Sequence, residues 1–159
     1  MSIPQWINLQ LGADNTYLRT QCTDIQKIND EVVAIAELLI DRMYKYDGVW
    51  LSWPQIWYCK NIFAFTEWDE NKKKIRREHH IIINPRITKK STGMNIWEEW
   101  CLSLPNVYGN VARNDWIKMT YYTIDKIKKS KTFTWFNARI IQHEFDHIQG
   151  ILFIDKQEL

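Results

Sequence analysis

The residues best suited to chemistry lie near the C-terminus, in the run Gln142-His143-Glu144-Phe145-Asp146-His147. On a helix, His143 and His147 are one turn apart on the same face, so both imidazoles can reach one metal ion. Glu144 stands beside the first histidine, where its carboxylate can take a proton from a metal-bound water. Asp146 adds a further carboxylate close to the ligands. The run therefore predicts a metal-dependent hydrolytic site.

The residues before this run predict the helix that the chemistry requires. Apolar side chains recur at helical spacing at Phe133, Phe136, Ile140 and Ile141, and Gly150 is a suitable helix stop. A pattern with three fixed positions also arises by chance, and the alternative is a surface helix with two solvated histidines. The apolar helix, its glycine stop and a candidate third ligand elsewhere favour the metal site.

Cys101 is the best candidate for that third ligand. It lies between Glu99 and Pro105, which indicates a bend rather than the middle of a long strand. A thiolate beside two imidazoles suits zinc or ferrous iron better than magnesium or calcium. The alternative is that Cys101 is a small buried hydrophobe, the common fate of a free cysteine.

The composition of the chain limits the classes of protein to which it can belong. The chain has 159 residues, 45% of them hydrophobic and 25% charged, which predicts a single globular domain over 1–159. A net charge of +2 is too small to indicate direct nucleic-acid binding. The three cysteines form no CxxC pair, which fits a reducing compartment. Without a signal-like start at Met1–Trp6 or a long apolar run, we expect a cytoplasmic protein that does not cross a membrane, with an organelle or a virus-infected host cell as open alternatives.

The order of the expected elements gives the fold class. A helix should begin at Asp30, with Asn29 or Asp30 as its N-cap, and end near Tyr46. Several short strands should follow, at 62–66, at 79–84 with Pro85 closing it, at 107–113 and at 116–124. A loop over 125–131 should lead into the metal helix. The pattern predicts an α+β fold with antiparallel strands around a C-terminal helix.

Three stretches, in this order, resemble the motifs of the peptide deformylases. Gly48-Val49-Trp50-Leu51-Ser52-Trp53-Pro54-Gln55 is similar to the family's glycine-apolar-glycine-apolar-alanine-alanine-x-glutamine. Glu99-Trp100-Cys101-Leu102-Ser103 resembles glutamate-glycine-cysteine-leucine-serine, and 142–147 resembles glutamine-histidine-glutamate-x-aspartate-histidine. With further likeness at 17–19, 83–85 and 150–155, the resemblance covers essentially the whole chain.

The resemblance implies removal of the N-formyl group from the initiator methionine of nascent polypeptides. It implies a bound Fe²⁺, replaceable by Zn²⁺, Ni²⁺ or Co²⁺. Glu144 would act as general base and then as proton donor to the leaving amine. The Gln55 amide and the Leu102 N–H would stabilise the oxyanion, and Arg113 would support the site. The metal ligands implied are Cys101, His143 and His147.

The same resemblance implies a monomer that meets formylated nascent peptides, with transient contact to the ribosome. The peptide would bind in extended form against the strand at 48–55. Trp50, Trp53 and Trp100 replace small residues of the family's motifs, and we expect the two indoles at the glycine positions, Trp50 and Trp100, to narrow or reshape the cleft. Arg139 stands where the family has apolar lining for methionine, so it should make the side-chain site more polar or extend to solvent.

These replacements keep two alternatives open. The first is a hydrolase of the same fold that prefers other N-acylated peptides or small amides. The second is a non-catalytic binding protein that keeps its metal for stability. Glu144 and Gln55 argue against the second, because stability alone needs neither.

Overall fold

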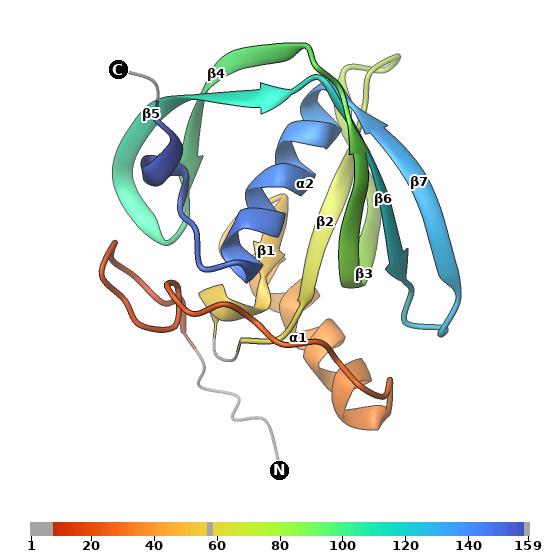
Figure 1. Ribbon diagram of the computed structural model, residues 1–159. Helices are drawn as coiled ribbons and strands as arrows, with labels where there is room; N and C mark the ends of the chain where they lie inside the picture. The colour runs from red at the N-terminus through yellow and green to blue at the C-terminus, as the bar shows by residue number, and fades with distance from the viewer. Residues whose placement is uncertain (1–7, 57–58, 158–159) are drawn as a thin grey trace.

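The computed structural model describes residues 8–56 and 59–157, in which an α-helix lies between two antiparallel sheets (Figure 1). The segment Met1–Trp6, where the sequence shows no signal-like start, lies outside the described residues. The elements in chain order are α1 (Asp30–Lys45), β1 (Trp50–Ser52), the 3₁₀ turn η1 (Trp53–Gln55), β2 (Ile62–Asp69), β3 (Lys74–Lys90), β4 (Met94–Cys101), β5 (Leu104–Asn114), β6 (Trp116–Tyr122), β7 (Lys128–Thr134), α2 (Trp135–Ile148) and the 3₁₀ turn η2 (Phe153–Lys156). The expected α+β class is confirmed.

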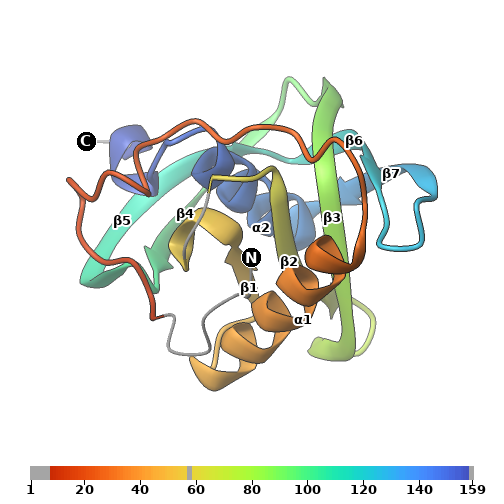
Figure 2. The ribbon, with the colours of Figure 1, turned by 90° about the horizontal axis from the view of Figure 1, so that it is seen from below.

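Helix α1 begins and ends where its sequence signals lie. The Asn29 side chain accepts a hydrogen bond from the Val32 N–H at 3.2 Å, which caps the helix. Acidic residues occupy the first turn and basic residues the last, as the helix dipole favours. Its apolar stripe packs under β1 and β2 (Figure 2). Among the described residues, no helix is long and apolar enough to cross a membrane.

The larger sheet has the order β1-β2-β3-β6-β7, and β4 and β5 form a separate two-stranded sheet. Strand β2 is buried on both faces because side chains alternate along it. Ile62 and Ala64 join the core beneath α1, whereas Phe63 and Phe65 join the core that contains α2. The sheet therefore separates the two helices and presents one face to α2.

Helix α2 is enclosed by both sheets, which explains why its polar residues are buried with its apolar ones. Ala138, Ile140 and Ile141 pack on the larger sheet. Gln142 receives a hydrogen bond from the Asn114 N–H at 3.1 Å and donates one to the Asn114 carbonyl at 3.0 Å, which ties the helix to β5. The expected stop is confirmed, because Gly150 adopts φ +75° just after the helix.

Two expectations about strands are wrong. Pro85 does not close its strand, because a register shift between Ile83 and Arg86 accommodates its missing N–H and β3 continues to Lys90. Asn84 takes φ +50° at this shift and bonds through its side chain to both backbone groups of Ile25. A bulge thus replaces the expected strand end.

The segment 125–131 is not a loop throughout. Strand β7 begins at Lys128 and pairs along β6 to the edge of the sheet. Its run of lysines hides the strand pattern, and lysines are typical of a protected sheet edge. Phe133 accordingly lies in β7 rather than in the helix, which begins at Trp135.

Candidate metal centre

Strand β4 and helix α2 bring together the three residues that the sequence proposes as metal ligands. Cys101 Sγ lies 3.2 Å from His147 Nε2, and the two histidine Nε2 atoms are 3.2 Å apart. All three ligand atoms lie within 4.8 Å of one another, and all three residues are buried. Nitrogen ligands around a tetrahedral ion stand about 3.3 Å apart, so this spacing fits one small divalent cation.

The chemistry of the three donors also fits a cation. Burial, and then the charge of Glu144, raise the pKa of the Cys101 thiol to about 12. Burial, and then the charge of His143, hold the pKa of His147 well below its ordinary value. His147 is thus a neutral imidazole, and Cys101 needs a positive charge nearby to become a thiolate. A bound metal supplies that charge and releases the thiol proton.

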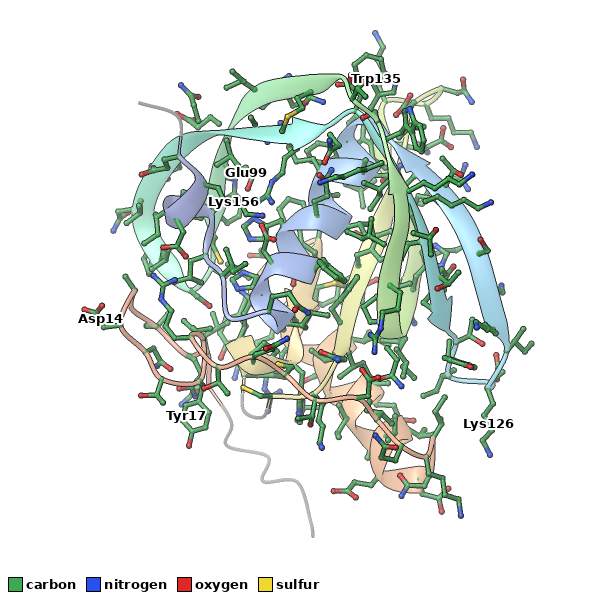
Figure 3. The ribbon with its side chains drawn as sticks, viewed as in Figure 1. Asp14, Tyr17, Glu99, Lys126, Trp135 and Lys156 are labelled. Carbon is green, nitrogen blue, oxygen red and sulfur yellow. The ribbon has the colours of Figure 1, made fainter. Side chains whose placement is uncertain are left out.

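Glu99 orients the first histidine. Glu99 lies on β4, on the side of α2 (Figure 3), and its Oε2 accepts a hydrogen bond from Nδ1 of His143 at 3.0 Å. Although burial raises the pKa of Glu99, hydrogen bonds from Arg113 and His143 and the charges of both hold it well below its ordinary value. Glu99 is therefore a carboxylate and the proton sits on Nδ1. This leaves the Nε2 lone pair of His143 facing the other two ligands.

A buried ion-pair network supports Glu99. Arg113 donates from Nε and Nη2 to its two oxygens at 2.9 Å each, and pairs through Nη1 with Asp146. Lys156 pairs with the other oxygen of Asp146 at 2.7 Å. Asp146 thus acts on the ligands through Arg113 and Glu99. The structure brings Arg113 to the expected place behind the ligands.

Arg139 does not extend to solvent, contrary to one expectation. It is 4% exposed and donates to Glu99 Oε1 at 2.6 Å and to the Val111 carbonyl at 2.9 Å. It also bonds twice to Asn95. The partner Glu99 explains its burial, because a paired and hydrogen-bonded charge can leave water. Arg139 therefore joins α2 to β4 and β5.

Glu144 lies beside the ligands, fully buried, and burial raises the pKa of its carboxyl well above the ordinary value. Neither of its oxygens has a hydrogen-bond partner among the described residues. The nearby Ser52 hydroxyl donates instead to Gln55 Oε1 at 3.0 Å. A buried carboxyl of this kind is costly unless a ligand completes it, so the site favours a polar molecule between Glu144 and the metal ligands.

Gln55 is held with its amide nitrogen toward the metal ligands. Its Oε1 accepts from both the N–H and the hydroxyl of Ser52, which fixes the amide. Its Nε2 then lies 3.4 Å from Cys101 Sγ and 3.2 Å from Ser103 Oγ. Leu102 follows Cys101 in the turn between β4 and β5, and a Cβ on Gly48 would lie 3.0 Å from its Cδ1. Gly48 thus allows the first and second motifs to meet.

The three unusual tryptophans have different positions. Trp50 is half-buried beside the ligands, with its ring centroid 6.3 Å from that of His143 and 6.4 Å from that of Trp100. Trp100 is 46% exposed. Trp53 is 1% exposed and belongs to the core beneath α1. Of the three, Trp53 therefore lies away from the metal ligands, because η1 turns its side chain into the opposite core.

Sequence reasoning missed the roles of Glu99 and Ser52. Glu99 is two residues before Cys101 in the same strand, so period-two alternation places both side chains on one face. Ser52 is three residues before Gln55, the spacing at which a side chain and backbone cap each other. Both spacings are visible in the sequence.

An HExxH helix clamped between antiparallel sheets, with a cysteine as third donor, defines a metal-dependent hydrolase of α+β fold. The family model described as polypeptide deformylase matches residues 9–158. The chain belongs to this family of metal-dependent enzymes, which remove N-formyl groups from nascent peptides.

Individual relatives agree with the family model. The chain is 36% identical over 144 residues to peptide deformylase 1 of Clostridium perfringens, covering 91% of this chain and 93% of the relative. It is 34% identical over 142 residues to the chloroplastic peptide deformylase 1B of Oryza sativa, covering 89% of this chain but about half, 52%, of that longer relative. A peptide deformylase from Acinetobacter baumannii with bound Met-Ala-Ser superposes with a TM-score of 0.85, at 25% identity and covering 94% and 97% of the two chains.

Proposed function

We propose that Cys101, His143 and His147 hold one Fe²⁺ ion, for which Zn²⁺, Ni²⁺ or Co²⁺ can substitute, and that this chain deformylates N-formyl-methionyl peptides with it. The soft thiolate and two neutral imidazoles support iron or zinc over magnesium and calcium. When bound, the ion acts as a Lewis acid and lowers the pKa of water. Side chains or backbone groups of this chain carry out each remaining step.

Glu144 is the proton carrier in this proposal, and the observation that carries it is a buried carboxyl whose oxygens have no hydrogen-bond partner among the described residues. One Glu144 oxygen takes the proton of the attacking water and then gives it to the leaving amine of the peptide. A raised pKa suits this double role, because the carboxyl must gain and lose a proton near neutral pH.

The Gln55 amide and the Leu102 backbone N–H stabilise the oxyanion that forms on the formyl group. Gln55 supports this role because Ser52 fixes its oxygen and leaves its Nε2 near Cys101. Preorganised donors of this kind contribute most when they need not rearrange during the reaction. Gln55 lies beside Cys101 in space, and Leu102 follows Cys101 in the sequence.

The substrate binds as an extended peptide along β1. Within the described residues, β1 pairs only with β2, so its other edge has backbone groups to offer a further strand. The Met-Ala-Ser of the Acinetobacter structure shows the kind of peptide that a relative binds. A monomeric state and transient ribosome contact are proposed from the family resemblance, and a cytoplasmic location from the reducing compartment that three cysteines without a CxxC pair favour.

The test is hydrolysis of formyl-Met-Ala-Ser by protein prepared without oxygen and loaded with Ni²⁺ or Co²⁺. We expect turnover that Glu144→Ala abolishes while metal content is retained, and little hydrolysis of acetyl-Met-Ala-Ser. Equal cleavage of the acetyl peptide would favour the hydrolase of broader N-acyl specificity. Absence of turnover with metal bound would contradict the proposal.

A further inference from the structure

Two cysteines far from the metal ligands in the sequence lie side by side where the segment before α1 meets the segment after η1 (Figure 1). A parallel bridge pairs Thr23 with Lys60 at this place. The Thr23 N–H donates to the Cys59 carbonyl at 3.2 Å, and the Asn61 N–H donates to the Thr23 carbonyl at 2.9 Å. This register sets Cys22 opposite Cys59, and we call these two residues the thiol pair.

The side chains of the thiol pair share one face of this bridge. The Lys60 ammonium donates to the Thr23 hydroxyl at 3.0 Å, so these two side chains lie together on one face. Because side chains alternate along an extended segment, those of the preceding pair lie together on the other face. There Cys22 and Cys59 are in hydrogen-bonding contact. Neighbouring strands lie about 4.8 Å apart, within the Cα separation of roughly 4.4–6.8 Å that a disulfide accepts.

The two thiols differ in how solvent reaches them. Cys22 is 7% exposed, whereas Cys59 is half-buried. Burial, and then the charge of Cys59 and the hydrogen bond with it, raise the pKa of the Cys22 thiol well above its ordinary value, and Lys60 lowers it. Cys59 Sγ donates to the carbonyls of Tyr17 and Thr20 at 3.4 Å and 3.6 Å. A reagent in solution therefore meets Cys59 first, and Cys22 reacts with a group already held beside it.

We infer that the thiol pair is a redox modification site, which a low-molecular-weight disulfide such as oxidised glutathione converts into a Cys22–Cys59 disulfide. The Cys59 thiolate attacks one sulfur of oxidised glutathione, whose S–S bond breaks and releases a glutathione thiolate. That thiolate takes up the Cys59 proton through solvent. Cys22 then loses its proton and attacks the Cys59 sulfur, and the second glutathione leaves with that proton. Two protein thiols are oxidised, and one glutathione disulfide is reduced to two thiols.

The disulfide fastens segments that carry parts of the metal centre. The Cys22 N–H donates at 2.8 Å to the carbonyl of Ile148, the last residue of α2. The segment before α1 also holds η1, through a hydrogen bond of 2.7 Å from the Gln10 N–H to the Gln55 carbonyl. The new bond closes the loop 22–59, which contains α1, β1 and η1. Closing this loop restricts the unfolded chain and so stabilises the folded one.

The test is titration of the Ni²⁺-loaded protein with oxidised glutathione, and it does not depend on the proposed reaction. We expect the parent to lose two of its three thiols, to retain no glutathione, and to yield a linked peptide that joins Cys22 to Cys59. Cys22→Ala should retain one glutathione on Cys59, because the second attack is impossible. Cys59→Ser should keep both remaining thiols. Cys101, which is 3% exposed, is the internal control and should stay unmodified.

Thermal unfolding measures the effect of the link. The oxidised parent should melt about 5–15 °C above its reduced form, and dithiothreitol should reverse the rise. Cys22→Ala, treated in the same way, should show no such rise. Loss of thiols in Cys59→Ser equal to that in the parent would overturn the inference. A parent that retains glutathione without linking the two peptides, or that links either cysteine to Cys101, would overturn it as well.

Discussion

Glu99 Oε2 and His143 Nδ1 are 3.0 Å apart in a site from which water is nearly excluded, and the carboxylate places the histidine proton on Nδ1. The metal-binding form of the imidazole is therefore set before any ion arrives. The carboxylate that sets it is itself fixed by Arg113 and Arg139.

Glu99→Gln should weaken metal binding by roughly 10- to 100-fold, the usual effect of losing an outer partner of a histidine ligand. An amide can turn its NH₂ group toward Nδ1, which favours the wrong tautomer. Competition with a chelating dye measures the affinity. Glu98→Gln is the control, because Glu98 is exposed on the same strand and should bind metal as the parent does. Equal affinities in both variants would disprove the orienting role.

Arg139→Leu should lower the free energy of unfolding by about 3–5 kcal/mol, because it removes one partner from a buried charge network. Glu99, Val111 and Asn95 would all lose hydrogen bonds. Urea unfolding measures the change. Arg86→Leu breaks a more exposed pair with Asp24 and should cost no more than about 1 kcal/mol. A similar small cost for both would mean that the network contributes little to stability.

Gly150→Ala should destabilise the protein by more than about 1 kcal/mol, because Gly150 has φ +75° and a Cβ there would lie 2.6 Å from the Arg19 carbonyl oxygen. Gly12→Ala isolates the backbone part of this cost. Gly12 has φ +99°, and a Cβ there would meet nothing within 4 Å. In thermal unfolding, Gly150→Ala should have a lower melting temperature than Gly12→Ala. The reverse order would show that the backbone after α2 shifts at little cost to accommodate the added methyl group.

The Arg19–Asp155 pair should make part of the stability depend on pH. The hydrogen bond from Arg19 lowers the pKa of Asp155 in the folded protein. Because the folded pKa is depressed, the stabilisation is present above the unfolded pKa near 3.8 and is lost as pH falls through the folded value. The difference in unfolding free energy between parent and Asp155→Asn should therefore be largest at pH 5–7 and shrink toward pH 2. A difference constant over this range would refute the linkage.

The sequence predicted the parts of the site that depend on local spacing. His143, Glu144 and His147 are held by one helix, so the four-residue repeat was sufficient. Gln55 required the family resemblance, and Cys101 was only a candidate without it, because their approach depends on how η1 and the β4–β5 turn meet in space. The alternative in which Arg139 extends to solvent was wrong because its burial depends on Glu99, a partner 40 residues away.

The fold was predicted less well wherever tertiary context outweighs local signals. Pro85 ends strands in general, but here a bulge and the Asn84 side chain absorb it. The lysines of 128–131 suggest a loop, yet they line an edge strand. Trp53 and Trp50 are three residues apart in one motif, and only the turn at Pro54 sends them into different cores.

The position of α2 in the chain has a consequence for synthesis. The helix that fills the space between the two sheets follows every described strand in the sequence, so a ribosome delivers it after the walls that enclose it. Until residues 135–148 emerge, Phe63, Phe65 and Ile82 lack the helix that covers them. Folding of these residues around α2 must therefore wait until residues 135–148 have emerged, and the proposed metal site, which needs His143 and His147, forms only after every described strand has been made.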